Sequence, residues 1–289
     1  MSAAATGTAQ AEPAQARCAR GGVAGAWAAD EAAGPYAVAL RDGRGPLFLR
    51  RTDGWLLPLE VERWCAEPDP VDLEVLARCE GSVLDVGCGP GRLVAALAVR
   101  GRRVLGIDVS EAAVAHTLHR LGAPPRRQHS GEPDTGARPA LRRSVFEPVP
   151  RAGRWDTALL VDGNIGIGGD PRALLRRLGL LVRPDGLLIA ETSAADVDER
   201  VRVEVVGVSG IREGGGGSFP WARVGAPALL RHAAVTGWRA VDQWTAGGRS
   251  FAALRSRSRN SSAEPPKSTA VISSQRARKP SAESPAASR

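Results

Sequence analysis

The strongest constraint on the fold is an alternation of apolar and amphipathic segments that begins near residue 82. "SVLDV", "RVLGIDV" and "WDTALLVD" are typical of short buried strands, with a weaker candidate in "ALRRSVF". Between them, "RLVAALAVR" and "SEAAVAHTLHRLG" indicate helices that end at glycine. A further helix is expected after Asp170 and Pro171, followed by the strand "LLIAE". Continuous apolar strands separated by helices predict an α/β fold with a parallel sheet covered on both faces.

The end of the chain follows a different pattern. "VRVEVVGV" indicates a strand and "GAPALLRHAAVTG" a helix. "WRAVDQWT" and "RSFAALR" are then joined by only "AGG". A parallel return needs a crossover of about a dozen residues or more, so we expect these last two strands to pair antiparallel.

The segment "VLDVGCGPGR", residues 83–92, carries the clearest functional signal. Gly87, Gly89 and Gly91 allow a sharp turn and close approach of a ligand to the backbone. The following helix offers unpaired N–H groups at its N-terminus. Asp108 ends the next strand, where a carboxylate can accept hydrogen bonds from ribose hydroxyls. Together these features predict a site for an adenosine-containing ligand; the alternative is a tight strand–helix turn without a ligand.

Four segments resemble motifs of the class I S-adenosylmethionine-dependent methyltransferases. "LDVGCGPG" is similar to the family's first motif, "GIDVS" to its second, "WDTALLVDGN" to its fourth, and "LVRPDGLLIAE" to the segment around its fifth strand. The glycine spacing is G-x-G-x-G, whereas a dinucleotide site usually has G-x-G-x-x-G. The resemblance covers about residues 80–254. It implies a Rossmann-like, doubly wound, seven-stranded and mostly parallel sheet with an antiparallel last strand, and S-adenosyl-L-methionine as the cofactor.

The resemblance also implies which residues contact the cofactor. Asp85 and the glycine loop would hold its methionine part, Asp108 its ribose, and Val109 its adenine. Phe146 would form an apolar wall, while the polar adenine contact stays open among Ser144, Val145 and Glu147. The expected cofactor-binding residues are Asp85, Gly87, Cys88, Gly89, Pro90, Gly91, Asp108, Val109, Phe146, Asp162 and Gly163.

Asn164 is one of only two asparagines in the chain and lies just past the fourth core strand. In the family, this position is near the departing methyl group, so its amide is a candidate catalytic contact with the acceptor. An amide can donate or accept a hydrogen bond without titrating. The alternative is a glycine-rich turn in which Asn164 has a left-handed conformation.

Other candidates for function have weaker signals. The aromatic residues Trp55, Trp64, Trp221 and Phe219 line an acceptor pocket or belong to the core, and "REGGGGSFPW" is a lid or a connection. His116 and His119 lack a third ligand for a catalytic metal, so no metal is expected. His129 and His232 are surface histidines or general bases.

Charge is concentrated at one end of the chain. The net charge is +8, of which residues 255–289 carry +6, with eight basic and two acidic residues. A nucleic-acid enzyme would show a basic stripe on its folded part, so a nucleic-acid substrate is disfavoured. No apolar run approaches the ~20 residues of a membrane span, and the N-terminus lacks the pattern of a signal peptide, so we expect a cytoplasmic protein. The four cysteines are far apart, which favours reduced thiols.

These observations predict four regions. Residues 1–33 form a disordered N-terminus, residues 34–80 a helical addition or lid, residues 81–254 the methyltransferase domain, and residues 255–289 a disordered basic tail. The predicted function is methyl transfer to a small-molecule acceptor. One alternative is a Rossmann-type NAD(P)-dependent oxidoreductase, which the glycine spacing and the final hairpin disfavour. The other is a non-catalytic module that binds an adenosine ligand. The acceptor, the methylated atom, any catalytic base and the oligomeric state are not specified by the sequence.

Overall fold

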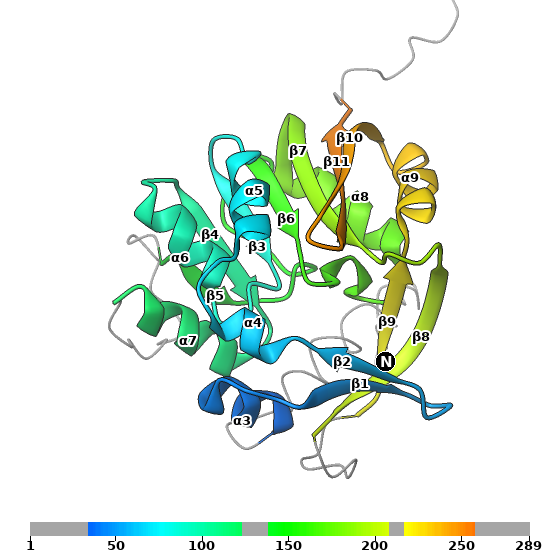
Figure 1. Cartoon of the computed structure of the whole chain (residues 1–289). Helices are drawn as coiled ribbons and strands as arrows, with labels where there is room; N and C mark the ends of the chain where they lie inside the picture. Colours follow the sequence, from blue (N-terminus) through cyan, green and yellow to red (C-terminus); the bar gives the residue numbers. More distant parts are fainter. Residues whose placement is uncertain (1–33, 123–137, 208–216, 258–289) are drawn as a thin grey trace, which may run out of the picture. The chain divides into compact units, whose positions relative to one another are not determined.

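The computed structural model describes residues 34–122, 138–207 and 217–257 (Figure 1). The predicted disordered N-terminus and nearly all of the predicted basic tail lie outside these residues, as do His129 and most of the glycines in the stretch 212–217. The last strand extends to Ser256, slightly beyond the boundary expected at residue 254.

Helices and strands are interspersed along the described chain. The helices, with one short 3-10 turn named η1, are α3 (Pro35–Asp42), α4 (Val61–Cys65), α5 (Pro70–Ala77), α6 (Arg92–Val99), α7 (Glu111–Arg120), η1 (Asn164–Gly166), α8 (Pro171–Leu181) and α9 (Ala226–Ala234). The strands are β1 (Leu47–Arg51), β2 (Leu56–Leu59), β3 (Val83–Val86), β4 (Val104–Asp108), β5 (Ala140–Arg142), β6 (Trp155–Leu160), β7 (Val182–Thr192), β8 (Asp198–Val206), β9 (Phe219–Val224), β10 (Trp238–Ala246) and β11 (Arg249–Ser256).

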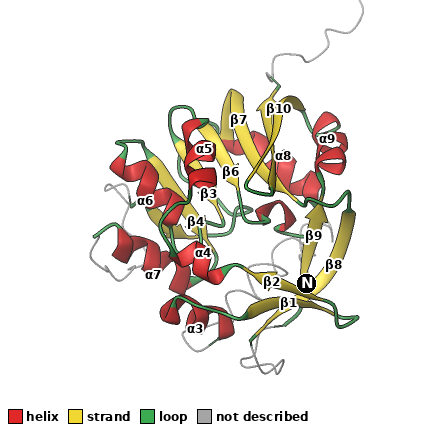
Figure 2. Ribbon diagram, in the orientation of Figure 1, coloured by secondary structure: helices red, strands yellow, loops and turns green. Residues whose placement is uncertain are grey.

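The central sheet has seven strands in the order β10-β11-β7-β6-β3-β4-β5. Figure 2 shows strands in yellow with helices in red around them. Strands β3 to β7 pair in parallel, whereas β11 pairs antiparallel with β7 and with β10. This order confirms the predicted doubly wound sheet with its antiparallel last strand. The chain reverses its direction of winding between β3 and β6, and ligands of open α/β sheets bind beside the strand ends at such a switch point.

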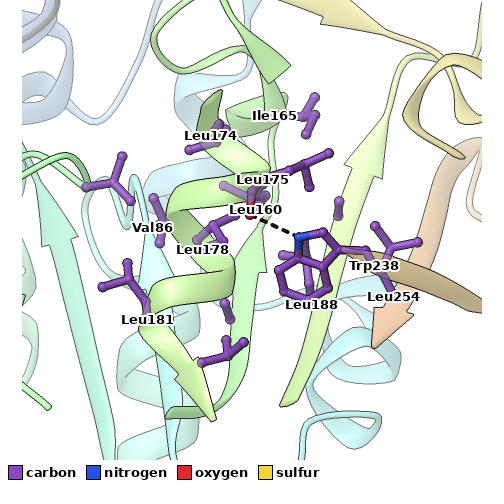
Figure 3. Packing of buried hydrophobic residues seen from close by; sticks show 14 of the residues in the cluster. Val86, Leu160, Ile165, Leu174, Leu175, Leu178, Leu181, Leu188, Trp238 and Leu254 are labelled. Carbon is purple, nitrogen blue, oxygen red and sulfur yellow. Dashed lines mark hydrogen bonds between the residues drawn. The ribbon is translucent and has the colours of Figure 1, made fainter. Parts of the chain in front are cut away.

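Alternate residues of the core strands face opposite layers of helices. On β6, Leu160 packs with the apolar faces of α8 and α9, whereas Leu159 packs with α5 and α6. A side-chain period of two on strands that are buried on both faces produces this pattern, and it explains their continuous apolar sequence. Figure 3 shows the layer around α8, in which Trp238 donates from its indole nitrogen to the Leu175 backbone oxygen at 3.0 Å.

Side-chain caps start three of the helices in the described chain. Asp69 accepts a hydrogen bond from the Asp72 backbone nitrogen at 2.7 Å, Ser110 accepts from Ala113 at 3.3 Å, and Asp170 accepts from the first turn of α8. Each cap satisfies a backbone donor that has no partner within the helix.

A second sheet, with the order β2-β1-β8-β9, was not expected. The sequence predicted residues 34–80 to be a helical addition; α3, α4 and α5 form there, but the hairpin β1–β2 lies between α3 and α4. Its strand β1 pairs antiparallel with β8, for example Leu49 with Val205. The local sequence pattern does not reveal a pairing between segments so distant in sequence. Such a pairing depends on apolar faces that only tertiary contacts bring together. This second sheet supplies one wall of the cleft described below.

Candidate functional site

A cleft lies where β3, β4 and β6 end, at the switch point of the central sheet. The empty volume of the cleft, including the part open to solvent, is about 880 Å³. One side consists of the loops that follow the parallel strands. The other consists of residues from α3, α4 and the second sheet. The site is therefore built from both sheets and from the N-terminal segment.

The glycine loop after β3 lines this cleft from Gly87 to Pro90. Gly87 and Gly89 have positive φ angles of 75° and 53°. A Cβ atom on Gly89 would meet only the Tyr36 hydroxyl oxygen, at 3.7 Å. The loop is thus left-handed and open toward the cleft, as close approach of a ligand to the backbone requires.

Gly91, by contrast, is not among the residues that line the cleft. Its φ angle is 84°, and a Cβ atom there would lie 2.5 Å from the Thr117 side chain. Its missing side chain lets α6 start against α7. In the structure, Gly91 therefore has a packing role.

Asp108 lies at the end of β4 and lines the cleft, as predicted. Its carboxylate accepts hydrogen bonds from the Gly89 backbone nitrogen at 3.0 Å and from the Ser110 nitrogen at 2.9 Å. Burial raises its pKa above the ordinary value, although the two N–H groups oppose that rise. Asp108 thereby fixes the glycine loop and keeps acceptor capacity toward the cleft, because a carboxylate has about four lone-pair sites.

The loop after β5 forms the neighbouring wall, with Val109 beside it. Ser144 and Val145 line the cleft, and Phe146 does not. The Phe146 ring packs beside Gly168, where an added Cβ would lie 2.8 Å from it. Glu147 accepts from the Ser144 backbone nitrogen at 2.8 Å and closes the turn. Among the three open candidates for the adenine contact, Ser144 and Val145 thus have access to the cleft.

Asp85 is placed beneath the glycine loop and does not line the cleft. Its side chain is 2% exposed, and its Oδ2 has no hydrogen-bond partner among the described residues. Burial raises its pKa to about 7, against the opposing charge of Arg92. The strand end therefore turns the Asp85 side chain into the interior beneath the loop.

In the turn after β6, the left-handed backbone conformation occurs at Asp162 and Gly163, and not at Asn164. Asp162 and Gly163 have φ angles of 60° and 80°, whereas Asn164 begins η1. The Asn164 side-chain nitrogen donates to the backbone oxygens of Val86 at 3.0 Å and Gly87 at 2.9 Å. The hypothesis of a left-handed Asn164 is wrong. The residue lines the cleft and joins two loops of the site, while Gly163 is exposed and does not line it.

A buried ionic network lies beside this turn and was missed in the sequence. Arg92, which is 4% exposed, contacts Asp72 and Asp162, each at 2.7 Å. Arg63 of α4 also reaches Asp162 at 2.8 Å, and Arg249 contacts Asp72 at 2.9 Å. Burial would raise the pKa of Asp72, but the hydrogen bonds and charges of Arg92 and Arg249 lower it to about 2. The partners come from four separate elements and the turn after β6, so no local sequence pattern predicts the network.

The far side of the cleft is mostly apolar and aromatic. Trp64 and Trp221 line it, as one reading of the sequence proposed. Trp55 does not; it is 39% exposed and lies under the guanidinium groups of arginines. Phe219 is buried in the second sheet. Tyr36, which the sequence did not single out, lines the cleft and has a pKa raised by burial and by the charge of Asp108.

The described histidines do not contribute to this site. His232 accepts from Arg172 at Nδ1 and contacts Asp198 through Nε2 at 2.9 Å, which is a structural role in α9. His116 and His119 lie on α7, away from the cleft lining. Within residues 34–122, 138–207 and 217–257, no group of three potential metal ligands is found. None of the helices in those ranges is long and apolar enough to cross a membrane.

The fold and the cleft together define a Rossmann-like methyltransferase. The glycine loop, the acid at the end of β4 and the antiparallel β11 all occur as that class requires. A model of the family described as "Methyltransferase domain" matches residues 61–224, more than half of this chain of 289 residues. The chain therefore belongs to the class I S-adenosyl-L-methionine-dependent methyltransferases, as the resemblance implied.

Individual relatives agree with this family. A ubiquinone biosynthesis O-methyltransferase of Marinobacter nauticus is 29% identical over 114 residues, which are 38% of this chain and 42% of that protein. One of Alkalilimnicola ehrlichii is 45% identical over 59 residues, 18% of this chain and 24% of that protein. The chain thus matches less than half the length of these curated relatives. A methyltransferase structure from Bacteroides fragilis, in complex with S-adenosyl-L-homocysteine, has a TM-score of 0.59 at 22% identity, over 77% of this chain and 94% of that one.

Proposed function

We propose that this methyltransferase acts on a small molecule, which binds between the glycine loop and the second sheet. The observation that carries the proposal is the continuity of the cleft from Gly89 and Asp108 to an apolar end lined by Trp64 and Trp221. A concave, mostly apolar pocket with few polar groups suits a small ligand. The curated relatives are named as O-methyltransferases of ubiquinone biosynthesis, which supports a small-molecule acceptor without identifying it.

The residues present in the cleft fit S-adenosyl-L-methionine. Asp108 offers acceptor capacity for ribose hydroxyls, and the left-handed Gly89 leaves space at the loop surface. Ser144 and Val145 would border the adenine. When bound, the cofactor supplies an electrophilic methyl group on a cationic sulfur.

The chain's own contribution is orientation of the two reactants. Asn164 joins the loops after β3 and β6, so the two sides of the reaction centre are held at a fixed separation. Arg63 of α4 forms an ion pair with Asp162, which lines the cleft. This contact positions α4 and its neighbouring residue Trp64. Holding reactants in a near-attack geometry of about 3–3.5 Å can supply much of the rate of a displacement.

Calorimetry and methyl transfer test the function. We expect the full chain to bind S-adenosyl-L-methionine and S-adenosyl-L-homocysteine but not NAD, and to pass a radiolabelled methyl group to a member of a small-molecule library. Preferred binding of NAD would support the oxidoreductase alternative. Cofactor binding without transfer to any small molecule, or transfer only to RNA or protein, would refute the small-molecule proposal.

A further inference from the structure

Two aromatic side chains from the N-terminal part of the described chain line the cleft beside the glycine loop. Tyr36 of α3 has its hydroxyl oxygen 3.7 Å from the place where a Cβ atom on Gly89 would lie. Trp64 of α4 lines the same cleft, and the two rings meet edge to face with their centroids 6.5 Å apart. Tyr36 lies outside residues 61–224, which the family model matches. This wall of the cleft therefore has a polar content that the family motifs do not assign.

The indole nitrogen of Trp64 lacks an acceptor. It is buried, and no hydrogen-bond partner for it is found in residues 34–122, 138–207 and 217–257. An indole N–H group can only donate, and a buried donor without a partner costs free energy. A donor of this kind in the wall of a cleft is satisfied when a ligand brings an acceptor to it.

Tyr36 supplies a second donor at the same wall. Its side chain is buried, and burial together with the negative charge of Asp108 raises its pKa well above the ordinary value. The hydroxyl therefore keeps its proton and can donate to an anion. Tyr36 and Trp64 thus present an O–H and an N–H group, and neither side chain adds a charge of its own.

The charges of the lining decide which end of the cleft suits an anionic group. Asp108 accepts from two backbone N–H groups and has no cationic partner in the described part of the chain. Asp162, by contrast, forms ion pairs with Arg92 at 2.7 Å and with Arg63 at 2.8 Å. An anion is therefore repelled at Asp108, whereas the charge of Asp162 is compensated. Trp64 follows Arg63 in α4, which this ion pair holds against Asp162.

We propose that Tyr36 and Trp64 bind the carboxylate at the amino-acid end of S-adenosyl-L-methionine, each donating one hydrogen bond. The carboxylate is the anionic group of this cofactor, and two neutral donors suit it. Asp108 is left to the ribose hydroxyls, which a carboxylate can accept. The inference gives the N-terminal segment a direct part in cofactor binding, and it does not depend on the identity of the methyl acceptor.

The segment that carries the two donors is anchored by contacts of its own. Besides the ion pair of Arg63, the Arg120 side chain of α7 donates to the Ala66 backbone oxygen at 3.1 Å, directly after α4. The Glu62 carboxylate accepts from the Gly45 backbone nitrogen at 2.7 Å and so joins α4 to the turn after α3. Donors that are positioned in advance lose less conformational freedom when a ligand binds, so more of each hydrogen bond contributes to affinity.

A pair of ligands that differ only in the carboxylate tests the inference by calorimetry on the full chain. They are S-adenosyl-L-homocysteine and its decarboxylated form, which keeps the amine, the sulfur and the adenosine. We expect the wild type to bind the first at least about tenfold more tightly, because hydrogen bonds to a charged group are lost with the carboxylate. Tyr36→Phe removes only the hydroxyl. We expect it to weaken binding of S-adenosyl-L-homocysteine about tenfold and binding of the decarboxylated form by less than about threefold.

Trp64→Phe removes the indole N–H group and part of the ring. The smaller ring affects both ligands, so the ratio of the two affinities isolates the hydrogen bond, and we expect this ratio to fall about tenfold. Trp55→Phe is the matched control, because Trp55 is exposed on the β1–β2 hairpin and does not line the cleft. We expect the control to change neither affinity by more than about twofold.

Three outcomes would overturn the inference. One is equal affinity of the wild type for the two ligands, and another is absence of binding by either. The third is an affinity ratio that stays at the wild-type value in Tyr36→Phe and in Trp64→Phe, which would mean that the two donors serve another group. Failure of methyl transfer to every small molecule tested would refute the proposed function and leave this result unchanged, because binding is measured without an acceptor.

Discussion

The side-chain amide of Asn164 lies directly against the backbone of Gly87. Its nitrogen is 2.9 Å from the Gly87 oxygen, and a Cβ atom on Gly87 would lie 2.6 Å from the same nitrogen. The loop after β6 and the glycine loop after β3 are thus joined through one side chain. Gly87 needs its missing side chain for this contact as well as for its positive φ angle.

The first prediction concerns this contact. Asn164→Asp replaces the donor with an oxygen that faces two backbone carbonyls, so we expect a loss of about 1–3 kcal/mol in the free energy of unfolding. We also expect cofactor affinity to fall about tenfold, because the glycine loop is displaced. Urea unfolding and calorimetry measure the two effects. Asn260→Asp, in the tail, is the matched control. Normal cofactor affinity in Asn164→Asp would show that the contact does not shape the loop.

The second prediction separates two glycines of the loop. In Gly89→Ala the new Cβ projects toward open space near Tyr36, so we expect a modest loss of stability from its positive φ but a loss of cofactor binding. In Gly91→Ala the Cβ collides with Thr117, so we expect the larger loss of stability, above about 1–2 kcal/mol. Thermal unfolding and calorimetry are compared for both variants. The opposite order would mean that Gly91, and not Gly89, faces the ligand.

The third prediction concerns Asp108. Asp108→Ala removes the acceptor for Gly89 and Ser110, together with any bond to ribose. Hydrogen bonds to a charged group are worth about 1.5–3 kcal/mol each, so affinity for S-adenosyl-L-homocysteine should fall at least tenfold. Glu111→Ala, at an exposed site on the adjacent helix, is the control. Equal affinities of the two variants would remove Asp108 from the cofactor site.

The elements near the glycine loop were predictable because their signals are local. The caps at Asp69, Ser110 and Asp170 and the alternating core strands each depend on a few neighbouring residues. The glycine spacing and Asp108 are likewise local signals, and Gly87, Gly89 and Asp108 lie on one side of the cleft.

The other side of the cleft depends on contacts between distant segments. Tyr36 and Leu49 reach the site only because β1 pairs with β8 and α3 packs on α7. Asp85 and Phe146 occupy the expected positions in the chain, but the strand end and the following turn direct their side chains into the interior. A motif fixes the position of a residue along the chain, whereas side-chain direction depends on packing that no single segment encodes.

The fourth prediction concerns the buried network. Arg92→Met leaves Asp72, which is fully buried, without its closest partner, so we expect a loss of about 3–5 kcal/mol in the free energy of unfolding. Arg78→Met, in an exposed ion pair, should cost less than about 1 kcal/mol. Adding Asp72→Leu to Arg92→Met should restore part of the loss, because it removes the unpaired charge. A double variant that is less stable than Arg92→Met would contradict this account.

The last prediction concerns the pH dependence of stability through Asp85. Its pKa is raised to about 7 in the folded chain by burial, from an ordinary value near 4. Between these values the folded state keeps a proton that the unfolded state releases. The stabilising contribution is therefore fully present below about pH 4 and is lost as the pH rises to about 7, with a slope of at most ~1.4 kcal/mol per pH unit.

Asp85→Asn cannot lose this proton, so its stability relative to the wild type should increase from pH 5 to pH 7 and level off above that. Asp156→Asn gives a control of opposite sign. Although burial would raise the pKa of Asp156, hydrogen bonds from Ser82 and the charge of Arg183 lower it. Its contribution is therefore present above about pH 4, and the difference from the wild type should stay constant between pH 5 and pH 8. Urea unfolding of the three proteins at pH 5, 6, 7 and 8 measures both differences. A difference for Asp85→Asn that does not change across this range would show that Asp85 is ionised in the folded protein throughout.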